Sequence, residues 1–307
     1  MSALPATAAP LPDWRHGPGA GVLLFLGALL LFAFYDAFAK QMVASHAPVV
    51  VNLSRYVCIS TVGLGLLLRH GQLRFWRQPH QGLLLARSSM LALVATCFMT
   101  ALVTMPLAEA TAIYFTAPLL MVALAPSLLG ERVRRAQWLA VAGGFAGMLL
   151  IVRPGHDLPL AGTLLMAVSA TGYALFQVFT RRLSGVVPAP VQFAHAAFTC
   201  LAVTLVLAAL SQDVQVPPWP QALVLLAGGL ASGGAQLLLL AAFRRTQAST
   251  LAPLNYVQLL LAVLISAFWF QRPPDGLAMA GMACIAVAGV YLARSAATPR
   301  QRHPETA

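Results

Sequence analysis

The chain contains ten apolar runs of about 20 residues each, and these runs limit its fold more than any other feature does. A hydrocarbon core about 30 Å thick needs roughly 20 apolar residues to be crossed by a helix. Breaks at glycine, proline, arginine and aspartate separate the runs. We therefore expect membrane-spanning helices over residues 21–41, 48–68, 82–104, 108–128, 136–152, 160–180, 190–210, 221–242, 248–270 and 276–293.

Composition supports an all-α integral membrane protein. Only 9% of the residues are charged and 59% are hydrophobic, whereas soluble proteins carry about 25% charged residues. The net charge of +11 comes from short arginine clusters between the apolar runs, so it does not indicate a nucleic-acid partner. The cysteines lie inside apolar runs without metal-ligand spacing, so we interpret all four as core thiols and expect no metal or cofactor. They are Cys58, Cys97, Cys200 and Cys284.

The distribution of positive charge predicts the direction of the helices. Fourteen arginines fall in one set of alternate connections and tails, whereas the other set holds only Lys40, Arg153 and Arg272. Because cytoplasmic loops are enriched in positive charge, both termini are predicted to be cytoplasmic. Residues 1–19, rich in proline and alanine, are expected to form a tail rather than a cleavable signal peptide, and 294–307 a second tail.

The two halves of the chain resemble each other when one is shifted by 140 residues. The segment "PLAEATAIYFTAPLL" (106–120) then aligns with "TQASTLAPLNYVQLL" (246–260), and Arg55 aligns with His195. Each predicted repeat, 20–153 and 159–293, holds five spans. Because five is odd, the second repeat must enter the membrane from the opposite side. Inverted repeats are typical of alternating-access transporters, whose binding site lies where the halves meet.

The residues also resemble a known family, the EamA domains of the drug/metabolite transporter superfamily. The resemblance is carried by "MPLAEATAIYFTAPLL" (105–120), by "GE" at 130–131, by the glycine-rich span ending in "RPG" (153–155), and by "YDAFAKQMVASHAPVVVNLSRY" (35–56). The second copy departs from the pattern, with Gln271 in the place of Glu131 and Gln258 in the place of Pro118. The resemblance implies a carrier in the bacterial inner membrane. Its cargo would be a small metabolite such as an amino acid, a nucleoside, riboflavin or S-adenosylmethionine.

Four charged residues are predicted to lie in the outer half of the bundle: Asp36, Lys40, Arg55 and Glu109. Charged groups inside a membrane are costly and commonly mark a transport path. Our hypothesis is that Glu109 pairs with Arg55 in the empty carrier and is released toward substrate or proton. The alternative is that these charges only neutralise one another, and Lys40 is then a boundary anchor. Arg87, near the cytoplasmic side, either extends to the lipid headgroups or lines the path.

Neutral polar residues supply further candidates for the path. In the sixth span Ser169, Tyr173, Gln177 and Thr180 share one helix face, which either lines a cavity or bonds to another helix. Gln236, with Ser232, repeats this pattern in the eighth span, where glycines allow close helix packing. Asn255 and Gln258 lie one turn apart near Pro253, where a backbone carbonyl is expected to lack its helical partner.

Aromatic residues in the spans are candidates for stacking on a ring or for ordinary packing. They are Tyr35, Tyr114, Phe115, Phe176 and Tyr256. At the cytoplasmic end of the fourth span, Gly130 is interpreted as a helix stop and Glu131 as a local partner of Arg134 or Arg135.

Three classes of function remain open. The first is a secondary transporter without ATP drive, because no nucleotide-binding motif is present; amino acids or similar amphipathic zwitterions are its favoured cargo. Riboflavin, nucleosides or S-adenosylmethionine are the alternative cargo, and protons a possible second partner. The second class is a membrane enzyme acting on a lipid-linked substrate, although the seven histidines show no ligand spacing. The third is a receptor or scaffold, for which the in-span charges are excessive.

Overall fold

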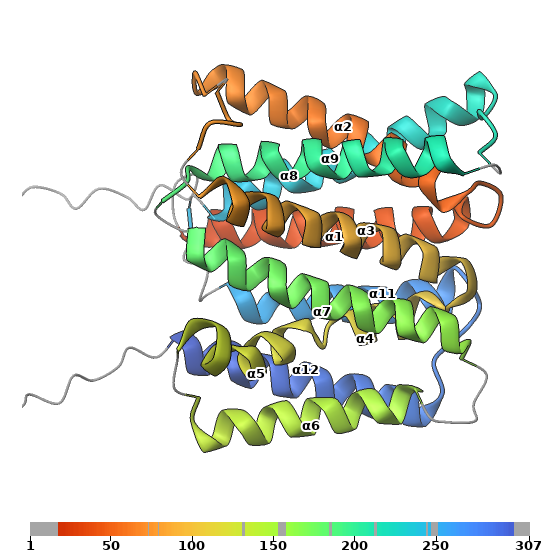
Figure 1. Ribbon diagram of the computed structural model, residues 1–307. Coiled ribbons are helices and arrows are strands. Elements are labelled where there is room, and N and C mark those ends of the chain that lie inside the picture. The colour runs from red at the N-terminus through yellow and green to blue at the C-terminus, as the bar shows by residue number, and fades with distance from the viewer. Residues whose placement is uncertain are drawn as a thin grey trace, which may run out of the picture.

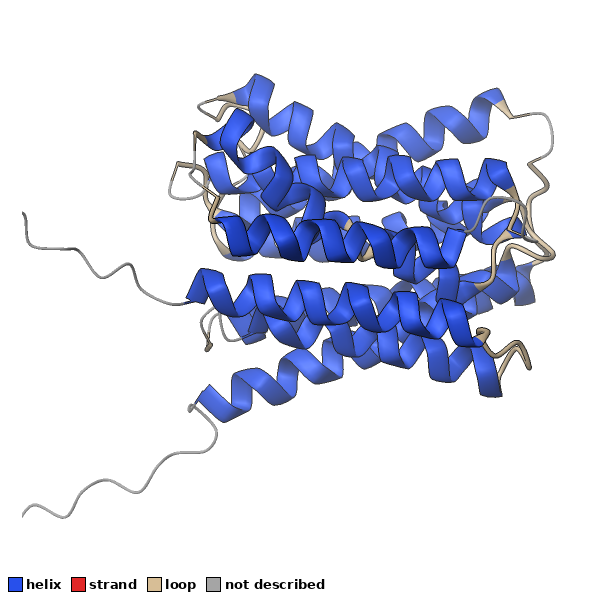
Figure 2. Cartoon of the chain, turned by 90° about the horizontal axis from the view of Figure 1, so that it is seen from below, coloured by secondary structure: helices blue, strands red, loops and turns tan. Residues whose placement is uncertain are grey.

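In the computed structural model the described residues are 18–297 without 73, 79, 131–132, 153–157, 184–185, 212–213, 244 and 247–250. Every regular element among them is a helix, and the helices lie side by side in one bundle (Figure 1; Figure 2). The first repeat contains α1 (Pro18–Met42), α2 (Pro48–Arg69), α3 (Gln81–Thr104), α4 (Leu107–Tyr114), α5 (Ala117–Leu129) and α6 (Arg135–Val152). The second contains α7 (Leu160–Leu183), α8 (Ala189–Leu210), α9 (Trp219–Phe243), the 3₁₀ turn η1 (Ala252–Asn255), α11 (Tyr256–Phe268) and α12 (Gly276–Ala297).

The apolar runs form helices at the predicted places. Among the described residues, eight helical segments are long and apolar enough to cross a bilayer, with α4 and α5 counted together, and α11 and α12 supply two shorter apolar helices. The predicted all-α membrane fold is therefore confirmed. The start of the ninth predicted span falls within 247–250, outside the described residues.

The fourth span is not continuous, which corrects the expectation of a single helix there. α4 ends at Tyr114 and α5 begins at Ala117. Pro118 has no N–H to donate to the carbonyl of Tyr114, so the helix is interrupted at this point. The Thr116 hydroxyl donates to the Ile113 carbonyl at 2.6 Å. In the second repeat the 3₁₀ turn η1 leads directly into α11 at the corresponding position.

Helix contacts follow an approximate twofold relation between the repeats. α1 packs against α9, and their counterparts α7 and α3 pack against each other. α2 packs against its own counterpart α8, and α6 against its counterpart α12. The last contact is close because Gly147 and Gly281 place each backbone against the other, where a side chain would clash. This exchange of partners is what inverted repeats produce.

The two ends of the bundle differ in charge and packing. We call the end that holds the α2–α3, α5–α6 and α7–α8 connections the arginine-rich end, and the opposite end the arginine-poor end. α1 begins and α12 ends at the arginine-rich end, on the left in Figure 1.

A cluster of buried apolar side chains closes the arginine-poor end, and we call it the seal. It draws on α1, α2, α3, α4, α7, α9 and α11. Its members include Tyr35, Val43, Val51, Leu102, Met105, Leu107, Met166, Leu225 and Ala262. Two polar links reinforce it: the Lys40 ammonium donates to the Leu102 carbonyl at 2.7 Å, and the His46 ring lies 3.1 Å from the Gln221 side-chain oxygen.

Candidate functional site: a cavity between the two repeats

A cavity of about 510 Å³ lies between the repeats, on the side of the seal that faces the arginine-rich end. Its wall is built from α1, α2, α3, α4, α5, α6, α7, α9, η1, α11 and α12. Asp36 and Arg55 stand at the sealed end, because Tyr35 and Val51 of the seal lie one residue and one turn away from them. At the other end the wall reaches Gln137 and the exposed Arg181. The cavity thus extends toward the arginine-rich end and stops at the seal.

The structure brings eight of the nine residues predicted for the path into this one wall. They come from seven elements spread over more than 200 positions of sequence and from both repeats. They are Asp36, Arg55, Tyr114, Tyr173, Gln177, Gln236, Asn255 and Gln258.

The charged part of the wall is organised around Arg55. Its guanidinium carbon lies 4.7 Å from the centroid of the Tyr35 ring and 5.7 Å from that of Tyr56. Its Nε donates to the Ser232 hydroxyl at 3.1 Å. Asp36 is its electrostatic neighbour and accepts a hydrogen bond from the Gln258 amide at 3.0 Å. A cation and an anion therefore stand together at the deep end of the cavity, each held by a neutral group of the other repeat.

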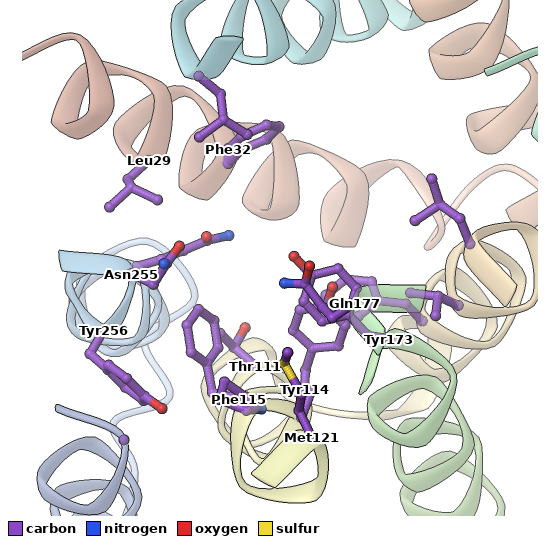
Figure 3. A pocket seen from close by; sticks show the side chains of 18 of the residues that line it. Leu29, Phe32, Thr111, Tyr114, Phe115, Met121, Tyr173, Gln177, Asn255 and Tyr256 are labelled. Carbon is purple, nitrogen blue, oxygen red and sulfur yellow. The ribbon is translucent and has the colours of Figure 1, made fainter. Parts of the chain in front are cut away.

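Aromatic rings form much of the remaining wall (Figure 3). The Tyr114 ring lies 5.1 Å from Tyr173 and 5.4 Å from Phe98, between centroids. The Phe115 ring lies 5.6 Å from Tyr256. Such rings offer faces on which a planar ligand can stack.

The rings stand among four side-chain amides. Gln177 and Asn255 reach the cavity from α7 and η1, on opposite sides of it (Figure 3). Gln236 and Gln258 do so from α9 and α11. Because an amide both donates and accepts, this set can recognise ring nitrogens and carbonyls.

Glu109 is the exception among the predicted residues. It does not line the cavity wall, and within the described part of the chain its Oε2 is buried without a hydrogen-bond partner. Its charged neighbour is Asp275, and the carboxylate beside Arg55 is Asp36. The expected Glu109–Arg55 pair is therefore wrong, because the α4 helix holds Glu109 away from the wall. A part for Glu109 elsewhere in the path stays a prediction.

The residues on the polar face of α7 have two different roles. Tyr173 and Gln177 line the cavity. Ser169 instead donates to the Val94 carbonyl of α3 at 3.2 Å, and the Thr180 hydroxyl accepts from Arg87 Nε at 2.7 Å. Both interpretations of this face, cavity lining and helix bonding, thus hold for different residues.

Arg87 neither extends to the headgroups nor lines the cavity, so both expectations for it are wrong. It is only 7% exposed. Besides Thr180, it donates to the Gln192 carbonyl at 2.9 Å and lies 4.3 Å from the centroid of the Phe176 ring. Two neutral hydrogen-bond acceptors and an aromatic ring thus hold this cation inside the α3–α7–α8 contact.

His195, the counterpart of Arg55 in the second repeat, also lies in the contact between α3 and α8. Its Nδ1 is 2.8 Å from the Ser88 hydroxyl oxygen and its Nε2 is 3.2 Å from the Gln81 amide nitrogen. Because the Gln81 amide nitrogen can only donate, His195 Nε2 accepts, and this arrangement fits a neutral ring with its proton on Nδ1. His195 is buried at 7% exposure and is absent from the cavity wall.

Other predictions have mixed outcomes. Gly130 ends α5 with a φ of 67°, as a helix stop requires; Glu131 lies outside the described residues, as do the tails 1–17 and 298–307. Cys58, Cys97 and Cys200 are buried, but Cys284 is exposed on α12, so it is not a core thiol.

Several residues of the cavity wall were not predicted from the sequence. Leu91, Val94, Ala95 and Phe98 form a face of α3, and their spacing is visible in the sequence but identical to that of a core face. Tyr56 directly follows Arg55, and only the helical geometry of α2 shows that both contribute to one wall.

A polar cavity closed at one end, between inverted repeats and beside a broken helix, defines a multi-pass membrane transporter. The profile described as the EamA-like transporter family matches residues 19–153 and again 160–295. The chain therefore belongs to the EamA-like transporter family, whose characterised relatives move small molecules and are not enzymes.

Individual relatives carry different cargo. The chain is 29% identical to the riboflavin transporter of Rhizobium johnstonii, over 72% of each chain. It is 28% identical to the pseudopaline exporter of Pseudomonas aeruginosa, over 90% of this chain and 96% of the relative. It is 22% identical to the S-adenosylmethionine uptake transporter of Rickettsia felis, over 93% and 96%. A solved crystal structure with 23% identity has the same fold, with a TM-score of 0.62 over 91% of this chain and 98% of the other.

Proposed function

We propose that this protein is a secondary transporter that carries a zwitterionic metabolite with a ring-bearing body, by alternating access. The observation that carries the proposal is the composition of the single wall: a cation and an anion at the sealed end, and rings with amides along the rest. Asp36 and Arg55 would receive the charged head. The rings of Tyr114 and Tyr173 and the amides of Gln177 and Asn255 would receive the body.

The size of the cavity favours a cargo larger than a simple amino acid. Its volume of about 510 Å³ falls among the roughly 300–1,000 Å³ of pockets that hold drug-sized ligands. S-adenosylmethionine, named for the Rickettsia relative, joins an amino-acid head to an adenine ring and fits both parts of the wall. Riboflavin, named for the Rhizobium relative, would use the rings and amides but not the charged pair.

The proposed setting is the bacterial inner membrane, with the repeats divided at 20–153 and 159–293 and both termini in the cytoplasm. The arginine-rich end then faces the cytoplasm. Because the cavity extends toward that end and the seal closes the other, this conformation would be the one open to the cytoplasm. A carrier of this kind needs a second conformation in which the seal parts.

Protons are proposed as a second partner, through Glu109. Its buried, unpartnered Oε2 lies near the seal and outside the cavity wall. A carboxylate so placed can take up and release a proton without competing for the cargo.

The test is uptake into proteoliposomes by the purified protein, with radiolabelled S-adenosylmethionine, tryptophan, adenosine and riboflavin in separate experiments. We expect saturable transport of S-adenosylmethionine or tryptophan, the two zwitterions, and its loss in Arg55→Ala. Transport of riboflavin or adenosine alone, unaffected by Arg55→Ala, would replace the zwitterion with a neutral ring compound. Absence of transport of all four would refute the proposed cargo class.

A further inference from the structure

Two hydrogen bonds join the charged pair of one repeat to neutral side chains of the other. The Gln258 amide of α11 donates to Asp36 Oδ2 of α1 at 3.0 Å. Arg55 Nε of α2 donates to the Ser232 hydroxyl of α9 at 3.1 Å. Within the described residues, both bonds therefore cross from the first repeat to the second.

Both bonds lie directly beneath the seal. Tyr35 of the seal is the neighbour of Asp36 in the chain, and Val51 lies one helical turn before Arg55. On the other side, Ala262 lies one turn after Gln258. Parting the seal between the repeats would have to break these bonds, because residues one turn apart on a helix move together.

The bond to Ser232 depends on close packing of α9 against α2. Gly229, one turn before Ser232, leaves no room for a side chain: a Cβ there would lie 2.6 Å from the Ser54 carbonyl oxygen. Ser232 itself is fully buried and does not line the cavity. Its hydroxyl thus meets Arg55 from behind the wall, whereas Arg55 and Asp36 face the cavity.

The partners in both bonds are neutral, and a charged ligand is a stronger partner than either. A carboxylate binds a guanidinium more strongly than a hydroxyl does, and an ammonium binds a carboxylate more strongly than an amide does. A zwitterionic head that reaches the sealed end can therefore replace Ser232 at Arg55 and Gln258 at Asp36.

We infer that Ser232 and Gln258 act as latches, which hold the seal closed in the empty carrier and are displaced by the charged head of the cargo. This inference rests on the proposed zwitterionic cargo. It assigns to Ser232, which touches no cargo, a positioning role: it makes opening of the seal depend on occupation of the cavity.

The test is a distance measurement across the seal in the full chain without cargo. Spin labels are placed at Ala44→Cys and Gly276→Cys after the four native cysteines are replaced. Ala44 is exposed in the α1–α2 connection, and a Cβ at Gly276, where α12 begins, meets nothing within 4 Å. Double electron–electron resonance then reports the populations with the seal closed and parted.

The decisive comparison is Ser232→Ala against Ser60→Ala. Ser60 is also a buried serine, on α2, and its hydroxyl has no hydrogen-bond partner among the described residues. We expect Ser232→Ala to raise the ratio of parted to closed molecules about tenfold, the effect of losing one hydrogen bond to a charged group. Ser60→Ala should leave the ratio at the wild-type value. Equal ratios in the two variants would overturn the inference.

A second readout concerns binding. Because Arg55 is already released in Ser232→Ala, this variant should bind S-adenosylmethionine several-fold more tightly than wild type. Weaker binding would show that the hydroxyl serves the bound state and would overturn the latch. Failure of the proposed function is distinguishable, since it appears as absence of uptake by the wild type, whereas the distance comparison needs no cargo.

Discussion

Arg55 and His195 occupy corresponding positions in the two repeats, yet they have opposite surroundings. Arg55 faces the cavity, with a ring, a hydroxyl and a carboxylate around it. His195 is buried between α3 and α8, with both ring nitrogens bonded to neutral side chains. The same place in the scaffold thus carries a group available to a ligand in one half and a satisfied packing group in the other.

The two repeats therefore share their helix packing but not the residues of the binding site. The exchange of helix partners is preserved between the halves, as in α1 with α9 and α7 with α3. The charged pair is not: Asp36 corresponds to Phe176, which packs against Arg87, and Gln258 corresponds to Pro118. The bond between Asp36 and Gln258 is therefore not repeated by the corresponding residues of the other half, Phe176 and Pro118.

The largest effect is expected for Arg55→Ala. Removing the guanidinium leaves the carboxylate of the cargo and Asp36 without their cation, which should weaken binding at least about 100-fold, or roughly 3 kcal/mol. Binding is measured by calorimetry on the purified protein. Arg55→Lys keeps the charge and should recover part of the affinity. Unchanged affinity in Arg55→Ala would remove the distinction between the two halves.

His195→Ala should change stability and leave binding alone. Loss of the ring removes its hydrogen bonds to the buried Ser88 and the partly buried Gln81, at a cost of about 1–3 kcal/mol in the free energy of unfolding. Thermal unfolding in detergent measures the loss, and calorimetry on the folded fraction should give wild-type affinity. Reduced affinity at wild-type stability would mean that His195, like Arg55, belongs to the binding site.

Tyr114→Ala should weaken binding of a ring-bearing cargo about tenfold. The substitution removes the face on which the ring stacks, worth roughly 1–1.5 kcal/mol. Tyr114→Phe keeps the ring and is the matched control, with affinity within about twofold of wild type. If the phenylalanine variant lost as much as the alanine variant, the hydroxyl and not the ring would recognise the cargo.

The smallest effect is expected for Glu109→Gln. Because Glu109 does not line the wall, cargo affinity should change by less than about twofold. The pH dependence of uptake is the readout for its proposed proton role, and loss of that dependence at wild-type affinity is the expected result. A large loss of affinity would return Glu109 to the cargo site.

Much of this architecture could be predicted from the sequence, because apolar length and charge placement follow directly from the bilayer. The polar residues of the cavity wall could also be predicted, since polar groups inside a span, such as Gln177 and Asn255, are costly unless they have a function. Which of these side chains contact each other could not be predicted. The approximate depth of Glu109 suggested a pair with Arg55, but helix rotation, set by packing, brought Asp36 there instead.

Apolar wall residues escaped prediction for a related reason. Phe98 and its neighbours on α3 show a helical apolar face, and whether such a face meets other helices or a cavity depends on the whole bundle. The burial of Arg87 is a second case, because its partners Thr180 and Gln192 come from α7 and α8.

The most direct test of the central claim is ligand-dependent thermal stability of the wild type and of Arg55→Ala. A ligand that binds only the folded state raises the melting temperature by mass action. The account predicts that S-adenosylmethionine or tryptophan raises the melting temperature of the wild type and fails to do so in Arg55→Ala. An equal rise in both proteins, or a rise only with riboflavin or adenosine, would contradict a zwitterion site at the sealed end of the cavity.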